Sequence, residues 1–421
     1  MRVCFTHLGC KLNQAETERL ARDFLAAGHR VVGSPGEADL HVVNTCTVTH
    51  TAARASRKAA RRAARTVLTG CYATDQPEEA ARLAGVDLVV PNLEKDRLLD
   101  RVHEAFPELA PTEVPVPWVH LPFGHTRALV KVEDGCNMRC SFCIIPSTRG
   151  RQRSRPVDEV VEEVRSLVES GYQEVVVTGV QISAYRSGDD RLCELVRAIL
   201  ARTGVPRLRL TSIAPWDLDE RLLDLWSDRR LCRHLHLSLQ SGSTGTLRRM
   251  RRPYTAGGYL DVLDQVRSAV PGVAITTDVI VGFPGEDEKE FEESLATVEA
   301  ARFAKAHVFP FSSRPGTEAA DLPGQVHPDV KKARMERMLA VADRAERDFR
   351  LAHLGRRETV LWERPVNGMG QGLTDNYLRV LCPEGAELRN RFSEVEVVGV
   401  AEDGVVGRLK TGDQSPCIWP R

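Results

Sequence analysis

The sequence predicts an α/β protein in three parts: an N-terminal domain built on a parallel sheet, a central partial (β/α)6 barrel and a small C-terminal β-barrel. Apolar strand-like runs alternate with amphipathic helical stretches over most of the chain, which favours parallel sheets. A proline-rich stretch at 111–124 interrupts this alternation and predicts a linker. From 356 onward, short β-forming runs are separated by Gly, Asp and Asn, as is typical of a small barrel. The expected domain boundaries are 1–118, 119–355 and 356–421.

The N-terminal part begins with an expected strand at 2–6, followed by a helix over 15–27. That helix is expected to end near Gly28, because glycine is common just past a helix C-terminus. Further strands are expected at 40–43, 66–68 and 86–90.

The central part contains six apolar runs with helical stretches between them. The helix expected at 157–170 carries its valines at helical spacing. Six units fall two short of a closed eight-stranded barrel, so an open or partial barrel is expected. The expected strands are 128–132, 174–178, 207–211, 234–239, 274–281 and 306–311, and those of the C-terminal part are 358–362, 377–382 and 395–400.

Composition excludes few functions. The 58 basic residues balance the 58 acidic ones, so the overall charge does not require a nucleic acid partner. The N-terminus does not read as a signal peptide, and no run approaches the roughly 18 apolar residues of a membrane span. We therefore expect a cytoplasmic protein without a membrane partner. In such a reducing compartment, cysteines that cluster by spacing bind metal or do chemistry more often than they cross-link.

The strongest local pattern is the spacing of Cys136, Cys140 and Cys143 directly after an apolar strand. Three thiolates in one loop can hold three irons of a [4Fe–4S] cluster and leave the fourth iron open. Structural zinc prefers four closed ligands, and no fourth Cys or His lies within the loop. The spacing therefore favours an iron–sulfur cluster.

This CxxxCxxC loop resembles that of the radical S-adenosylmethionine (SAM) superfamily. The resemblance implies that the open iron binds SAM through its amino and carboxylate groups. It also implies that Phe142, the aromatic residue before the third cysteine, lies near the adenine of SAM. Active sites of barrel folds form at the strand ends. By position, the residues expected to hold SAM are Thr178, Gly179, Ser212, Gln240 and Asp278.

A second group of cysteines is dispersed in sequence but shares one context. Cys10, Cys46 and Cys71 each end a predicted strand. The carboxyl ends of parallel strands lie along one edge, so the three thiols can converge there. Three cysteines again suggest a cluster with one open iron, although buried unreactive cysteines are the alternative. Gly9 and Gly70 precede two of them and leave the backbone room beside a bulky cofactor.

The motifs GCKLNQAE (9–16), NTCTVT (44–49) and GCYA (70–73) resemble those of the methylthiotransferases. These are radical SAM enzymes with an additional N-terminal cluster domain and a C-terminal barrel like the TRAM RNA-binding module. The resemblance implies two [4Fe–4S] clusters, two SAM molecules per turnover and a flavodoxin- or ferredoxin-like electron donor. It implies that a radical removes hydrogen from C2 of an adenine, and that the cluster on Cys10, Cys46 and Cys71 donates a methylthio group.

The motifs most resemble the branch that modifies N6-threonylcarbamoyladenosine at tRNA position 37. The alternatives are the branch that modifies isopentenyladenosine and the branch that modifies an aspartate of a ribosomal protein. A non-catalytic iron–sulfur RNA-binding protein and a zinc-stabilised RNA-binding protein are further alternatives, which the complete set of barrel motifs disfavours.

A run of basic residues favours RNA, and here the expected partner is a tRNA anticodon stem-loop. Six side chains recur at helical spacing between 51 and 66 without an acid among them, so they form one basic face. They are Arg54, Arg57, Lys58, Arg61, Arg62 and Arg65. A solvated helix face is the alternative, but such a face commonly mixes both signs. Three more arginines after the cluster loop are expected to contact RNA: Arg149, Arg151 and Arg153.

The remaining candidate ligands are interpreted as structural. His234, His236 and His307 lie on predicted strands and are expected to be core or hydrogen-bonded residues. The other five cysteines have no metal-like partners in the sequence: Cys4, Cys193, Cys232, Cys382 and Cys417.

Overall fold

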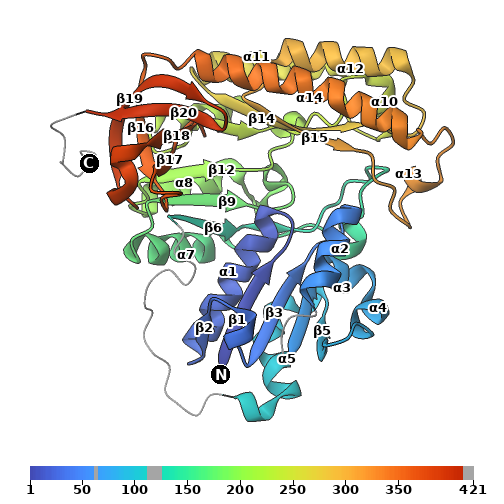
Figure 1. Ribbon diagram of the computed structural model, residues 1–421, viewed down its shortest axis with the longest axis vertical. Helices are drawn as coiled ribbons and strands as arrows, with labels where there is room; N and C mark the ends of the chain where they lie inside the picture. The colour runs from blue at the N-terminus through green and yellow to red at the C-terminus, as the bar shows by residue number, and fades with distance from the viewer. Residues whose placement is uncertain (61–64, 111–125, 411–421) are drawn as a thin grey trace.

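The computed structural model describes residues 1–60, 65–110 and 126–410 and contains the three expected parts (Figure 1). Within these ranges, no helix is both long and apolar enough to cross a membrane. The predicted linker at 111–124 lies outside the described residues, as does Cys417.

The N-terminal domain is a five-stranded parallel sheet in the order β2-β1-β3-β4-β5. The sequence missed β2, a three-residue edge strand that is only partly buried. The strands are β1 (Arg2–His7), β2 (Arg30–Val32), β3 (Leu40–Thr45), β4 (Thr66–Gly70) and β5 (Leu88–Val90). The helices are α1 (Lys11–Ala26), α2 (His50–Ala59), α3 (Cys71–Asp75), α4 (Pro77–Ala81) and α5 (Leu98–Ala105).

The central domain is an open arc of six parallel strands, as predicted. Two three-stranded sheets, β12-β9-β6 and β13-β14-β15, are linked by single parallel bridges such as Ile213 with Leu237. The strands are β6 (Arg127–Lys131), β9 (Glu174–Thr178), β12 (Arg207–Leu210), β13 (His234–His236), β14 (Ala274–Val281) and β15 (Lys305–Pro310). The main helices are α7 (Val157–Glu169), α8 (Leu192–Arg202), α11 (Ala256–Ala269), α12 (Glu288–Ala301) and α14 (Pro328–Leu351).

Helix α1 joins the N-terminal domain to the open edge of the arc (Figure 1). Ala15 of α1 packs against Leu129 of β6 and Val176 of β9. Their strand neighbours Ala128 and Val175 belong instead to the core beneath the outer helices. Because side chains alternate across a strand, α1 lies on the inner face of the arc. The N-terminus of α1, which carries Cys10, is therefore brought toward the interior of the central domain.

The C-terminal domain is a closed five-stranded barrel in the order β16-β17-β18-β20-β19. The sequence missed β17 and β20, which are glycine-containing strands that lack a clear alternating pattern. The strands are β16 (Arg357–Trp362), β17 (Gly370–Thr374), β18 (Arg379–Cys382), β19 (Phe392–Ala401) and β20 (Gly404–Leu409).

This barrel docks on the amino-terminal ends of the central strands. Arg207 of β12 donates hydrogen bonds to the carbonyls of Leu373 and Thr359, both at 3.0 Å. Arg209 donates to the carbonyl of Asp375 at 2.8 Å. The barrel therefore lies at the opposite end of the strands from the loop that carries Cys136.

The predicted basic helix is shorter than expected. α2 ends at Ala59, and Arg65 directly precedes β4, where it forms an ion pair with Glu108. The prediction of one continuous stripe through Arg65 is therefore wrong, because the chain must leave the helix in order to start β4 at Thr66. Arg61 and Arg62 lie outside the described residues, whereas Arg54 and Lys58 are exposed on α2. Arg57 lies on the same helix, with a guanidinium nitrogen 3.9 Å from a carboxylate oxygen of Glu79.

Candidate active site

The first cysteine triad lies in the loop after β6. Gly135 (φ 74°) turns the chain so tightly that a Cβ there would clash with the Arg151 carbonyl. The backbone N–H of Met138 donates to Cys136 Sγ at 3.4 Å, and Arg252 Nη1 donates to Cys140 Sγ at 3.4 Å. These donors favour anionic sulfur, because they hydrogen-bond the charged form.

Burial has the opposite effect on these thiols, because it disfavours their charged form. It raises the pKa of the Cys136 thiol, and it raises the pKa of Cys143 to about 12. Thiols buried in this way lose their protons when a metal binds, so the loop suits metal-bound thiolates rather than free ones. Among the described residues, no group of three or more His, Cys, Asp or Glu side chains is arranged to hold a single metal ion. Cysteines of an iron–sulfur cube bind different irons, so the triad fits a cluster.

The second cysteine triad lies at the carboxyl edge of the N-terminal sheet. Cys46 and Cys71 directly follow the paired strands β3 and β4. Cys46 lies against Gly9, where an added Cβ would be 2.6 Å from the Cys46 sulfur, and Gly9 precedes Cys10. Burial raises the pKa of Cys46 to about 11, and the charges of Cys71 and Cys10 add to this effect. The geometry therefore brings together the three thiols that the sequence placed at strand ends.

A buried ion cluster connects the two triads. Arg149, six residues after Cys143, has a side chain that is 1% exposed. Its Nη1 donates to Glu16 Oε1 and to Asp134 Oδ1, both at 2.9 Å, and its Nη2 donates to Asn13 Oδ1 at 2.6 Å. Glu16 and Asn13 belong to α1, whereas Arg149 and Asp134 belong to the central domain. The cluster thus crosses the interface between the two domains.

Two lysines complete this buried ion cluster. Lys95 Nζ lies 2.6 Å from Glu16 Oε2, and Lys131 Nζ lies 3.1 Å from Glu16 Oε1. We therefore define the cluster by five residues: Glu16, Lys95, Lys131, Asp134 and Arg149. Three cations face two carboxylates, which leaves an excess positive charge beside the second triad. Burial raises the pKa of Cys10, and the charge of Arg149 opposes this effect.

The side-chain amide of Asn92 provides a second connection between the two triads. Asn92 Nδ2 donates to the Thr148 carbonyl at 2.9 Å and lies 3.7 Å from Cys71 Sγ. Thr148 belongs to α6 (Ile145–Arg149), which packs against α3 (Cys71–Asp75). Buried contacts therefore connect the elements that carry the two cysteine triads.

This geometry corrects one prediction and leaves two others open. Arg149 was expected to contact RNA, but that expectation is wrong, because its charge is satisfied in the interior. Arg153 is 43% exposed and pairs with Asp134 at 3.2 Å, and Arg151 is exposed. Sequence reasoning missed the role of Glu16, although it lies within the GCKLNQAE motif.

Of the five residues predicted to hold SAM, four lie at or after the end of a strand and one lies within a strand. Thr178 ends β9, and Gly179 follows it. Ser212 (φ 52°) and Gln240 (φ 65°) follow β12 and β13 in a left-handed conformation that side chains rarely adopt. Such strain persists where the surroundings enforce it, and it is common at functional sites. Asp278 lies in the middle of β14 rather than at its end.

Side-chain contacts further define this face. Asp278 Oδ2 lies 3.2 Å from Nε2 of His236, which is partly buried, while His234 is buried. His307 is exposed, so of the two expected roles, core or hydrogen-bonded, the core role is excluded for it. The ring of Phe142 meets Phe283 edge-on at 6.4 Å between centroids.

Comparison with known proteins agrees with this geometry. The description Radical SAM superfamily matches residues 130–298, and Uncharacterized protein family UPF0004 matches residues 2–91. The threonylcarbamoyladenosine tRNA methylthiotransferase MtaB of Bacillus subtilis (strain 168) is 35% identical over 94% of this chain and 93% of its own length. The chain belongs to the radical SAM methylthiotransferase family. The tRNA-2-methylthio-N(6)-dimethylallyladenosine synthase of Anaeromyxobacter dehalogenans (strain 2CP-C) is 37% identical to this methylthiotransferase over 88% of this chain and 86% of its own length.

Solved structures support the fold of the methylthiotransferase. The radical S-adenosylmethionine methyltransferase TsrM from Kitasatospora setae superimposes with a TM-score of 0.55 at 17% identity, covering 76% of this chain and 77% of TsrM. Membership of the superfamily implies SAM and a [4Fe–4S] cluster as cofactors.

Two glutamates on α1 allow the buried ion cluster of the methylthiotransferase to be tested. Burial alone would raise the pKa of Glu16, but Arg149, Lys95 and Lys131 hold it well below its usual range. Glu16 therefore stabilises the fold above the unfolded pKa of about 4.3, and this contribution is lost as the pH falls. Glu16→Gln should cost about 3–5 kcal/mol at pH 8, because it leaves buried cations unpaired. Urea unfolding measures this loss.

Glu18, two residues further along, is the matched control. Burial raises its pKa to about 7. Its folded pKa lies above the unfolded value, so ionisation of Glu18 costs stability as the pH rises from about 4.3 toward 7. Glu18→Gln should therefore be neutral or stabilising at pH 8. Equal losses for the two variants would contradict the assigned role of the buried ion cluster.

Proposed function

We propose that this methylthiotransferase converts N6-threonylcarbamoyladenosine at position 37 of tRNA to its 2-methylthio derivative. The observation that carries the proposal is the connection of two cysteine triads through one buried ion cluster. An aromatic C–H bond has no acidic proton, so radical chemistry is needed to break it, and a second group must supply sulfur in the same site. The name of the Bacillus subtilis relative, which aligns over nearly its whole length, supports the choice of substrate.

The two triads have different tasks in this proposal. Cys136, Cys140 and Cys143 would hold the cluster that binds SAM, and Cys10, Cys46 and Cys71 would hold a second [4Fe–4S] cluster. When bound, these groups and two SAM molecules per turnover supply the radical and the methylthio group. Arg252 and the loop amides stabilise the sulfur charge of the first triad. The buried side chains of Arg149 and Asn92 connect the second triad to the first.

Exposed cations support an RNA substrate. Arg54 and Lys58 on α2, and Arg151 after the first triad, are available to neutralise phosphates of an anticodon stem-loop. A base in such a loop is unpaired and can be splayed into a pocket at modest cost. A flavodoxin- or ferredoxin-like protein would supply the electron.

The second candidate substrate is the isopentenylated adenosine at the same position. It is favoured by the similar identity of the dimethylallyladenosine synthase from Anaeromyxobacter dehalogenans. A ribosomal-protein aspartate is a weaker candidate, because it would not need the exposed cations.

Nucleoside mass spectrometry of tRNA from cells with and without the gene tests the substrate. Loss of 2-methylthio-N6-threonylcarbamoyladenosine, with accumulation of its precursor, is the expected result. Loss of the methylthio group from the isopentenyl nucleoside alone would show the second candidate to be correct. Unchanged tRNA nucleosides would overturn both.

Substitution of one cysteine in each triad should separate SAM cleavage from methylthio transfer. Cys10→Ala should lose about half of the bound iron and all methylthio transfer, yet still cleave SAM to 5′-deoxyadenosine. Cys136→Ala should also lose about half of the iron, but it should not cleave SAM. Cys232→Ala removes a cysteine buried away from both triads and is the control, with iron content and both activities unchanged. Full SAM cleavage by Cys136→Ala would contradict the assignment.

A further inference from the structure

Lys11 is an unpaired cation beside the second triad. It directly follows Cys10, begins α1 and is exposed. Its Nζ lies 5.1 Å from the centroid of the Tyr377 ring, and no carboxylate of the described residues lies within ion-pairing distance of it. An exposed ammonium that contacts an aromatic ring but no carboxylate is free to bind an anion.

The ammonium of Lys11 faces the inner side of the central strands. Burial lowers the pKa of His234 on β13, and the nearby charge of Lys11 contributes to this shift. His307 is opposite Asp278 in the register of β14 and β15. Through Tyr377, which stacks on His234, Lys11 therefore lies toward the strand face that carries Asp278, one of the residues expected to hold SAM.

The ring of Tyr377 lies on one side of the Lys11 ammonium. Tyr377 lies in a turn of the C-terminal barrel with φ at 65°, and its ring stacks on His234 with 4.5 Å between centroids. The Arg209 guanidinium lies 5.1 Å from the same ring, but Arg209 is already paired with Glu174 at 2.7 Å. Of these cations around the ring, Lys11 alone keeps an uncompensated charge among the residues that the structure describes.

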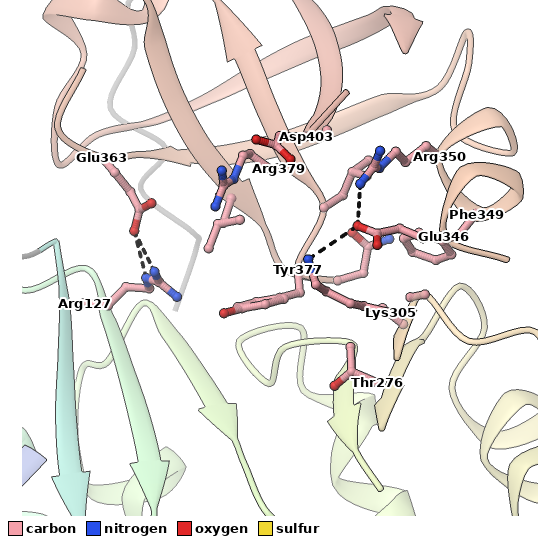
Figure 2. Close-up of a pocket in the computed structure, with 16 residues that line it drawn as sticks. Arg127, Thr276, Lys305, Glu346, Phe349, Arg350, Glu363, Tyr377, Arg379 and Asp403 are labelled. Atoms are coloured by element: carbon pink, nitrogen blue, oxygen red, sulfur yellow. Dashed lines mark hydrogen bonds and ion pairs between the residues drawn. The ribbon is translucent and has the colours of Figure 1, made fainter. Parts of the chain in front are cut away.

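Unlike Lys11, most cations in the wall of the neighbouring cavity are paired with carboxylates. This cavity of about 170 Å³ lies between the C-terminal barrel and the starts of the central strands, with Tyr377 in its wall (Figure 2). Within the described ranges, three of the cations that line it, but not Arg379, are already paired with glutamates that an entering anion would have to displace. The pairs are Arg127 with Glu363 at 2.8 Å, and Lys305 and Arg350 with Glu346.

The proposed substrate carries a carboxylate that such a free cation can bind. A threonylcarbamoyl group on N6 ends in a carboxylate, whereas an isopentenyl group is apolar. In adenine, N6 and C2 lie on the same edge of the ring, on either side of N1. A base whose C2 reaches the triad that includes Cys10 can therefore place its N6 substituent beside the adjacent residue, Lys11.

We propose that Lys11, held against Tyr377, binds the carboxylate of the threonylcarbamoyl group and thereby selects this substrate. The inference rests on the proposed function and names the residue that determines specificity. An apolar substituent would cover the ammonium without pairing it, and this desolvation cost disfavours the wrong substrate.

The test uses the reconstituted enzyme and anticodon stem-loops that differ at one group. One RNA carries N6-threonylcarbamoyladenosine and the other carries its methyl ester, so all phosphate contacts are the same. A hydrogen bond to a charged partner is worth about 1.5–3 kcal/mol, so the wild type should bind the acid about 10- to 150-fold more tightly than the ester. Fluorescence anisotropy measures Kd, and product formation measures kcat/KM.

Lys11→Gln should bind both RNAs with the ester's affinity while retaining the iron of both clusters. Lys11→Arg should keep the preference for the acid, and so should Lys332→Gln, which removes an exposed lysine on α14. An unchanged preference in Lys11→Gln would overturn the inference while leaving the proposed function intact. A wild-type enzyme that methylthiolates only the isopentenyl stem-loop would overturn the proposed function itself, and the inference with it.

Discussion

Glu16 and Arg149 form an ion pair with almost no exposure to water, and it lies between the two cysteine triads. Their burial is costly, and the cost is offset only because Lys95, Lys131 and Asp134 complete the surrounding charges. Removing one member leaves an unpaired charge in the interior. These contacts consequently stabilise the relative position of the N-terminal and central domains, and with it that of the two sites that the proposed reaction must bring together.

All three domains contribute side chains to the surroundings of Lys11. α1 of the first domain crosses the inner face of β6 and presents Cys10 and Lys11, while the central strands present Asp278 and His307. The C-terminal barrel contributes Tyr377 from beneath, held by hydrogen bonds from Arg207 and Arg209 to barrel carbonyls. The barrel, which was expected to bind RNA or substrate, therefore lies beside Lys11.

The sequence predicted what depends on local spacing. The loop of Cys136, Cys140 and Cys143 and the strand-end position of Cys10, Cys46 and Cys71 follow from neighbouring residues. The partners of Arg149 could not be predicted this way, because Glu16 lies 133 residues away and a charge pattern does not distinguish buried from exposed arginines. Short or glycine-rich strands such as β2 and β17 carry too little hydrophobic pattern to be recognised, since pairing with longer neighbours stabilises them.

The central claim is that the two triads hold clusters in one connected site. Electron paramagnetic resonance of the anaerobically reconstituted, fully reduced enzyme tests it most directly. Magnetic coupling between the two reduced clusters should broaden the wild-type spectrum, and substitution of either triad should restore the sharp spectrum of a single cluster. A wild-type spectrum equal to the sum of the two single-cluster spectra would show that the clusters are far apart and would contradict the account.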